Sequence, residues 1–240
     1  MGKEMPEFIE EKNINEHKVE TCADLPIEGG GVQKLILPFN GRSTVYCGWK
    51  ASGYTKKTGK VMYGQTIKGP TRIDGDFGST SWSYNQPVYA SGAGVVKKIY
   101  NSRSTNGPGK VICIVYENVW NHTKKKGYSV AARYFYMQEI SSSLSVGKRV
   151  SAGTYLGKAG SNSNSNMGDI TGGALHIEFD TDTTYVDYSP TVTKLSDGIY
   201  PGYDTTIDPC ELFHIGSGQS IDKTTVSGWV YSNDVNLPTR

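Results

Sequence analysis

The chain is poor in histidine, and its cysteines are scattered. Its 240 residues include four histidines, and none of them lies between His17 and His122. There are also four cysteines, with no Cys-x-x-Cys pair among them: Cys22, Cys47, Cys113 and Cys210. Structural zinc sites need closely spaced ligands, so this spacing disfavours one. The even number of cysteines leaves disulfides open, whereas Cys113 in "KVICIVY" is predicted to be a buried free thiol.

Long apolar runs and a strong net charge are also missing. The formal net charge is +2, and the short basic run at residues 124–126 is interpreted as loop charge, so we expect no nucleic-acid partner. No apolar run is long enough to span a membrane. The N-terminus is charged and lacks the apolar stretch of a secretory signal. Either the native chain is not exported by the usual route, or a leader or anchor has been removed.

Glycine and tyrosine are abundant instead, with 29 and 16 residues. This composition is typical of many short strands joined by turns, and it predicts a mostly β, mainly antiparallel fold with long loops and little helix. We expect a polar extension or linker at residues 1–30, a central domain at 31–215 and a β-like C-terminal appendage at 216–240.

Several segments have clear strand patterns. "PVYASGAGVVKKIY" predicts two strands around a glycine turn, and "GKVICIVYENV" and "YSVAARYFYM" predict a hairpin joined through "WNHTKKKG". Residues 67–86 are interpreted as a long loop. The aromatic residues Trp82, Tyr84 and Tyr89 of "STSWSYNQPVY" can line a binding surface or pack the loop. "DPCELFH" predicts one short helix capped by Asp208, with His214 at its end. His122, in "WNHTKKKG", is predicted to be a loop residue.

The stretch "GGALHIEFDTDT", residues 172–183, predicts a half-buried strand with one histidine on its polar face. Its apolar face carries Leu175, Ile177 and Phe179, and its polar face carries Ala174, His176, Glu178 and Asp180. Two histidines at i and i+2 would share a face and serve one metal. Here only His176 is present, so the strand holds half of such a pair.

Taken in order, these segments resemble the lysostaphin/LytM-type zinc metallopeptidases, which cut peptide cross-bridges of bacterial cell walls. The most characteristic segment is "VGKRVSAGTYLGKAGS", because a similar segment precedes the H-x-H strand of the family. The resemblance covers roughly residues 45–215. It implies an antiparallel β-sheet core of the LytM peptidase (duplicated hybrid motif) type, with a groove bounded by loops.

The resemblance also implies a ligand set that this chain has largely lost. In the family, an H-x-x-x-D motif and the second histidine of H-x-H hold zinc, and the other histidines of H-x-H and Y-x-H act on the attacked carbonyl. Three ligands leave one position for the water that the metal activates. Here Ala174 takes the place of the first histidine of H-x-H, His176 remains as a vestigial ligand, and Tyr136 takes the place of the histidine in Y-x-H.

Two registers are open for H-x-x-x-D. "MYGQT" gives Met62 and Thr66, supported by the preceding "GWKASGYTKKTGK", and "RIDGD" gives Arg72 and Asp76, supported by the short distance to "PVYASG". In both, the first zinc histidine is absent. Methionine and threonine are poor zinc ligands, and arginine is a permanent cation. We therefore expect no cofactor, unless nearby carboxylates re-form a site; the candidates are Asp74, Asp76, Asp169 and Glu178.

These substitutions predict a catalytically inactive pseudo-peptidase that binds peptidoglycan or a protein of the cell envelope or of a phage. Its expected location is extracytoplasmic, in the envelope or a phage particle. One alternative is an active zinc endopeptidase with a rearranged site, and another is a structural component of a phage tail or envelope assembly. The residues expected at the groove are Met62, Thr66, Arg72, Asp76, Trp82, Tyr136 and His176.

Overall fold

The computed structural model of the chain is mostly β, as predicted. It describes residues 31–52, 55–56, 63–69, 71–73, 80–82, 86–101, 110–160, 174–184, 186–187, 194–195, 198–199, 204–223 and 237–240. Helix in this part of the chain is limited to short turns, such as the 3-10 turn η4 (Pro209–Glu211). None of these helices is long and apolar enough to cross a membrane.

The strands are short except in the central hairpin. In chain order they are β1 (Leu35–Ile36), β2 (Gly41–Cys47), β3 (Gln65–Lys68), β4 (Thr71–Ile73), β5 (Thr80–Trp82), β6 (Pro87–Tyr89), β7 (Gly94–Tyr100), β8 (Lys110–Asn121), β9 (Lys126–Ile140), β10 (Arg149–Val150), β11 (Tyr155–Ala159), β12 (Leu175–Asp180), β13 (Lys194–Leu195), β14 (Gly198–Ile199), β15 (Thr206–Ile207), β16 (Phe213–His214) and β17 (Gln219–Lys223).

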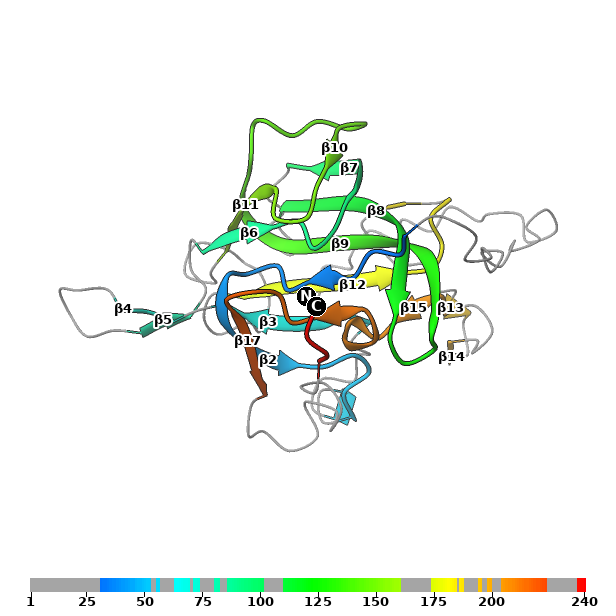
Figure 1. The fold of residues 1–240 in the computed structure, drawn as a ribbon, viewed down its shortest axis with the longest axis horizontal. Coiled ribbons are helices and arrows are strands. Elements are labelled where there is room, and N and C mark those ends of the chain that lie inside the picture. Colours follow the sequence, from blue (N-terminus) through cyan, green and yellow to red (C-terminus); the bar gives the residue numbers. More distant parts are fainter. Residues whose placement is uncertain are drawn as a thin grey trace, which may run out of the picture.

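One large sheet contains most of these strands (Figure 1). Its order is β10-β7-β8-β9-β12-β3-β2-β17, with β11 pairing to β6 and β9, and β15 pairing to β12. The pairs are antiparallel except β17 with β2. The segment predicted as a C-terminal appendage therefore contributes one strand, β17, beside β2. β12 lies in the middle of the sheet, between β9 and β3.

The predicted hairpin "GKVICIVYENV"–"YSVAARYFYM" is confirmed as β8 and β9. Figure 1 shows this long green hairpin bending away from the sheet at its closed end. The bend coincides with a register shift between Tyr116 and Val119, where Asn118 has a φ of 52°. An extra residue in one strand bends a β-ladder, and asparagine tolerates this left-handed conformation better than most residues.

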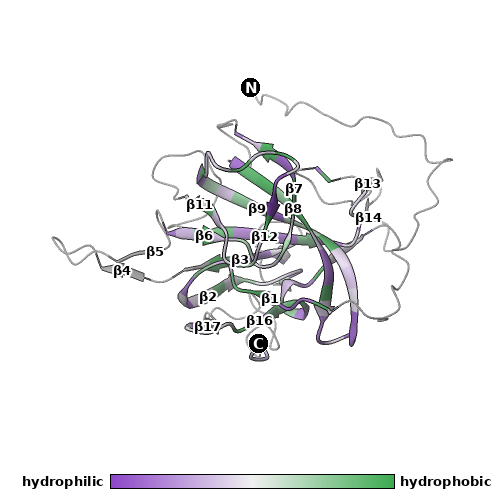
Figure 2. Cartoon of the chain, turned by 45° about the horizontal axis from the view of Figure 1, so that its top comes forward, coloured by the Kyte–Doolittle hydropathy of each residue, from purple (hydrophilic) through white to green (hydrophobic). Residues whose placement is uncertain are grey.

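The central strands bury both of their faces. On one face, Ile112, Tyr134 and Ile177 belong to the main hydrophobic core, and on the other, Cys113 and Phe135 belong to a smaller cluster. Figure 2 shows stretches of apolar residues, in green, mixed with polar ones in these strands. All six residues of β12 are buried, so the prediction of a half-buried strand was wrong. Its polar face is covered as well.

Three local predictions need correction. Within 67–86, β4 and β5 pair as a hairpin, because their threonine, isoleucine and tryptophan favour strands over loop. The predicted helix and its Asp208 cap are confirmed as η4, with the carboxylate accepting from the Cys210 N–H at 2.9 Å, but the helix is only a single 3-10 turn. His214 lies in β16 and not at a helix end, because this segment pairs in parallel with β1.

The described cysteines are all free and buried. They are Cys47, Cys113 and Cys210, while Cys22 lies outside the described residues. The prediction of a buried free thiol at Cys113 is confirmed. Desolvation by burial raises the pKa of Cys113 to about 12, so this thiol stays protonated and unreactive.

Gly64, directly before β3, packs so closely against β12 that it leaves no room for a side chain. A Cβ at this position would lie 2.2 Å from the main-chain oxygen of Ile177 and 2.6 Å from Cγ of Glu178. We expect Gly64→Ala to lower the free energy of unfolding by about 2 kcal/mol, measured by urea denaturation. Gly31→Ala is the matched control, because its Cβ meets nothing within 4 Å. Equal stability of the two variants would contradict this reading of the strand contact.

Candidate functional site

His176 is buried on β12, on the side of the sheet away from the main core. Its backbone neighbours are Thr66 on β3 and Phe135 on β9, and only 7% of the residue is exposed. The Phe135 ring centroid lies 5.4 Å from that of the imidazole, and the Tyr136 ring centroid lies 6.2 Å away. The structure therefore brings Thr66, Tyr136 and His176 together.

Both ring nitrogens of His176 have partners inside the protein. Nδ1 lies 3.3 Å from the hydroxyl of Thr66, and Nε2 lies 3.0 Å from Oε1 of Glu178. A carboxylate accepts hydrogen bonds, so Nε2 donates a hydrogen bond to Oε1 of Glu178. The Thr66 hydroxyl bonds to Nδ1 on the other side of the ring. These two side chains fix the orientation of the imidazole.

The structure places the two H-x-x-x-D candidates differently. Thr66 of the first register is the cross-strand neighbour of His176. Arg72 of the second register lies on β4, which pairs with β5, and Figures 1 and 2 both show this hairpin projecting away from β12. The remaining member of each motif, Met62 in one and Asp76 in the other, lies outside the described residues.

The described neighbours of His176 do not fit a catalytic zinc ion. Such a site needs three protein ligands, but Nδ1 of His176 faces the neutral hydroxyl of Thr66. Within the described ranges, no group of three or more His, Cys, Asp or Glu side chains can hold a metal ion. The carboxylates Asp74, Asp76 and Asp169 lie outside those ranges, so the absence of zinc stays a prediction.

Charged side chains are buried beside His176. Arg133 is the cross-strand neighbour of Glu178 and is completely buried. Its Nε donates to the main-chain oxygen of Asp187 at 2.6 Å, and its Nη2 lies 3.3 Å from Oδ2 of Asp180. Among the described residues, neither Nη atom of Arg133 has a hydrogen-bond partner, and neither does Oε2 of Glu178. The sheet thus buries polar groups whose hydrogen-bonding capacity is only partly used.

Sequence reasoning missed Arg133. The signal was available, because Arg133 is the one charged residue in the otherwise apolar strand segment "VAARYFYM". A charge at such a position either faces solvent or needs buried partners, and the pattern alone did not distinguish the two.

Tyr136 has an unusual backbone conformation. Its φ is 61°, at a register shift between β8 and β9, and its main-chain oxygen accepts from the Gly160 N–H at 2.7 Å. A bulky residue rarely adopts this left-handed conformation, which is strained and persists where the surroundings enforce it. The bulge leaves the partly buried Tyr136 ring beside Phe135 and His176.

The structure describes two of the other aromatic candidates in part. Trp82 ends β5 in the projecting hairpin, and Tyr84 lies outside the described residues. Tyr89 ends β6, and its ring packs edge-on against Tyr155 with centroids 6.2 Å apart.

Comparisons with known proteins agree with this fold. Residues 76–188 match the model of peptidase family M23. A zinc-containing peptidase from Vibrio cholerae is similar, with 18% identity and a TM-score of 0.42 over 74% of this chain and 39% of that one. The SpoIIQ–SpoIIIAH pore-forming complex has 14% identity and a TM-score of 0.45, over 76% of this chain and 92% of that one. Lysostaphin is 17% identical, with a TM-score of 0.42 over 79% of this chain and 59% of that one.

The fold is mostly β, and one segment of the chain is similar to a peptidase family. The resemblance to the lysostaphin/LytM-type peptidases is confirmed, with residues 76–188 as the M23 segment of the chain. No curated protein matches this sequence. The chain spans 39% of the Vibrio cholerae peptidase and 59% of lysostaphin, so the activities of those proteins are not transferred with the fold.

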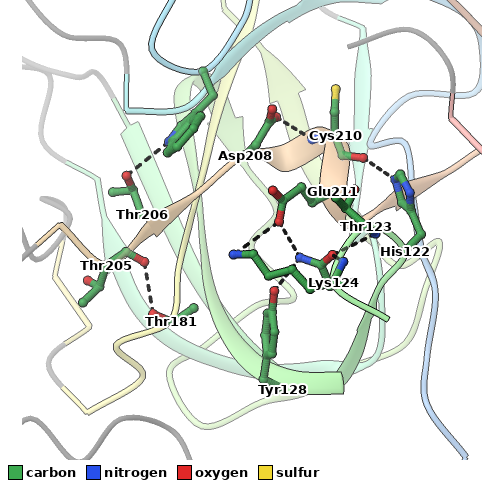
Figure 3. Close-up of polar contacts among 12 residues, drawn as sticks. His122, Thr123, Lys124, Tyr128, Thr181, Thr205, Thr206, Asp208, Cys210 and Glu211 are labelled. Atoms are coloured by element: carbon green, nitrogen blue, oxygen red, sulfur yellow. Dashed lines mark hydrogen bonds and ion pairs between the residues drawn. The ribbon is translucent and has the colours of Figure 1, made fainter. Parts of the chain in front are cut away.

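His122 and His214 hold other parts of the fold together. His122 follows β8, and its Nε2 bonds to the main-chain oxygen of Cys210, while Lys124 pairs with Glu211 at 3.5 Å (Figure 3). His214 is buried, with its ring centroid 5.4 Å from that of His122. Burial lowers the pKa of His214 to about 4, against its ordinary 6.5. This cluster attaches η4 and β16 to the end of β8.

The lowered pKa of His214 predicts a loss of stability in acid. Between pH 6.5 and 4 the unfolded chain binds a proton at this residue that the folded chain does not, so the free energy of unfolding falls as the pH falls. The full loss is on the order of 3 kcal/mol. Urea denaturation at several pH values should show this slope in the wild type and a shallower one in His214→Gln. Identical slopes would mean that His214 is not the titrating group.

Proposed function

We propose that the chain is a catalytically inactive member of the M23 peptidases, which binds a ligand through the side of the sheet that bears His176. The observation that supports this most strongly is the pair of bonds from His176 to Thr66 and Glu178. In an active family member the corresponding histidine needs a nitrogen for zinc. Here both nitrogens are satisfied by side chains, and Ala174 and Tyr136 replace the histidines that act on the attacked carbonyl.

The geometry favours the first H-x-x-x-D register. The Thr66 hydroxyl lies 3.3 Å from Nδ1 of His176. Two side chains that bind the same metal ion must lie close together, and these two do. Gly64 packs directly against β12, which fixes β3 at this distance. We therefore assign Thr66 to the position of the zinc-binding aspartate and Met62 to that of the first histidine.

Restoring the lost ligands tests this assignment. We expect the double variant Met62→His/Thr66→Asp to bind about one zinc ion per chain, because it completes a His, Asp and His176 set. The matched control is Arg72→His, which completes H-x-x-x-D in the other register with the existing Asp76. Zinc per chain is measured by mass spectrometry after removal of loose metal. Zinc in the control and none in the double variant would reverse the assignment.

Peptidoglycan is the ligand that the family suggests, and a protein of the envelope or of a phage particle is the alternative ligand. The cell envelope is accordingly the proposed location. The aromatic rings of Phe135 and Tyr136 beside His176 offer apolar contact, and the Tyr136 hydroxyl can donate to a carbonyl. Neither contribution requires a metal ion.

Binding and cleavage are separated by one experiment with purified peptidoglycan. We expect the wild type to sediment with it and to release no peptide, with or without added zinc. Tyr136→Phe should weaken sedimentation by about two- to tenfold, the effect of one hydrogen bond, while Tyr89→Phe, its matched control, should not. Release of peptide fragments would refute inactivity. Failure to sediment would exclude peptidoglycan as the ligand.

A further inference from the structure

Two residues that follow β12 return across the side of the sheet that bears His176. We call this pair, Val186 and Asp187, the strap. Val186 is buried in the smaller hydrophobic cluster, together with Phe135, whose ring contacts His176. Asp187 is exposed at the surface. The strap is therefore a piece of peptide lying next to the candidate site, with one side chain pointing in and one facing solvent.

Three side chains from three strands hold the strap. The main-chain oxygen of Asp187 accepts a hydrogen bond from Nε of Arg133 on β9 at 2.6 Å, and it lies 3.6 Å from Sγ of Cys113 on β8. The hydroxyl of Tyr100 on β7 donates to the carboxylate of Asp187. The sheet thus binds the apolar side chain of Val186 and both the main-chain oxygen and the carboxylate of Asp187.

The strap packs on an apolar face of the sheet. Val186 belongs to the same cluster as Val111, Cys113, Val115, Ala131 and Phe135, which are between 0% and 7% exposed and lie outside the main core. An apolar sheet face of this kind either packs against the rest of its own chain or marks a binding surface. In this protein the chain itself supplies part of the cover.

While the strap is closed, buried Arg133 has hydrogen-bonding capacity that is not used, which is energetically unfavourable. Arg133 is completely buried, and neither of its Nη atoms has a hydrogen-bond partner among the described residues. A buried charged group with unmade hydrogen bonds is unfavourable, and water or a ligand oxygen would satisfy it once the strap moved. Opening gives up the burial of Val186 and the bonds of Asp187 to Arg133, Cys113 and Tyr100, and hydration of Arg133 offsets part of this loss.

We propose that the strap occupies, in the free protein, the place of an extended peptide ligand with an apolar residue followed by an acidic one. A ligand main-chain oxygen would take the position of the Asp187 oxygen on Arg133, its apolar side chain would pack on Phe135, and its carboxylate would accept from Tyr100. The strap must move before this ligand binds. The proposal rests on the proposed function only for the role of this face in ligand binding.

Labelling of Cys113 measures strap opening without any ligand. Its thiol lies under the strap, so a thiol reagent reaches it only when the strap is lifted. We expect Asp187→Ala and Val186→Ala each to speed labelling of Cys113 by roughly tenfold, since each removes one hold of the strap. Mass spectrometry reads the rate at each cysteine. Asp222→Ala, which alters an exposed carboxylate paired with Arg42 on the sheet edge, is the matched control.

Cys47 and Cys210 are internal controls, because they are buried but are not bonded to the strap. An unchanged rate at Cys113 would overturn the proposal. Equal acceleration at all three cysteines would also overturn it, since that result indicates general unfolding and not local opening.

A peptide with the strap sequence tests the ligand chemistry. The probe is the acetylated and amidated peptide Thr-Tyr-Val-Asp-Tyr, the sequence of residues 184–188, and its control has asparagine in place of aspartate. We expect the probe to bind Val186→Ala/Asp187→Ala at least about tenfold more tightly than the wild type, and more tightly than its control does. Equal or absent binding to both proteins would overturn the ligand claim. Release of peptide fragments from peptidoglycan, with the labelling and peptide results as expected, would refute the proposed function alone.

Discussion

The arrangement at the centre of this molecule depends on one buried histidine whose two nitrogens are already bonded. His176 lies between Thr66 and Glu178 on a strand that is buried on both faces. A metal ion at Nδ1 would have to displace the Thr66 hydroxyl and find two further ligands. The bond from His176 to Thr66 joins β12 to its neighbour β3.

The same strand explains why charged groups and a covering segment occur together. β12 carries Glu178 and Asp180 on the face that bears His176, and Arg133 on β9 faces them. Burying these charges requires partners, and the main-chain oxygen of Asp187 is one of them. The strap is thus held by the groups that it covers. The strap bonds directly to Arg133, and Val186 packs in one cluster with Phe135, whose ring lies beside His176.

Much of the fold follows from local patterns, and the site does not. The β8–β9 hairpin was predictable because apolar residues alternate on both sides of a short polar turn. The burial of the polar face of β12 was not, because its cover comes from residues 186–187, and no periodicity in β12 reports what packs on it. The H-x-x-x-D register was open for a similar reason: the proximity of Thr66 to His176 arises from pairing between β3 and β12, which are far apart in sequence. Arg133 looked like an isolated charge until its partners were in place.

The central claim is that His176 serves a hydrogen-bonded site and not a metal site, and zinc binding to the unmodified chain tests it most directly. The protein is equilibrated with micromolar zinc, freed of loose metal, and its zinc per chain is compared with that of His176→Ala. The account predicts the same negligible zinc content in both proteins. About one zinc ion per wild-type chain, lost in His176→Ala, would contradict it and would point to a re-formed site with Glu178 or other carboxylates as ligands.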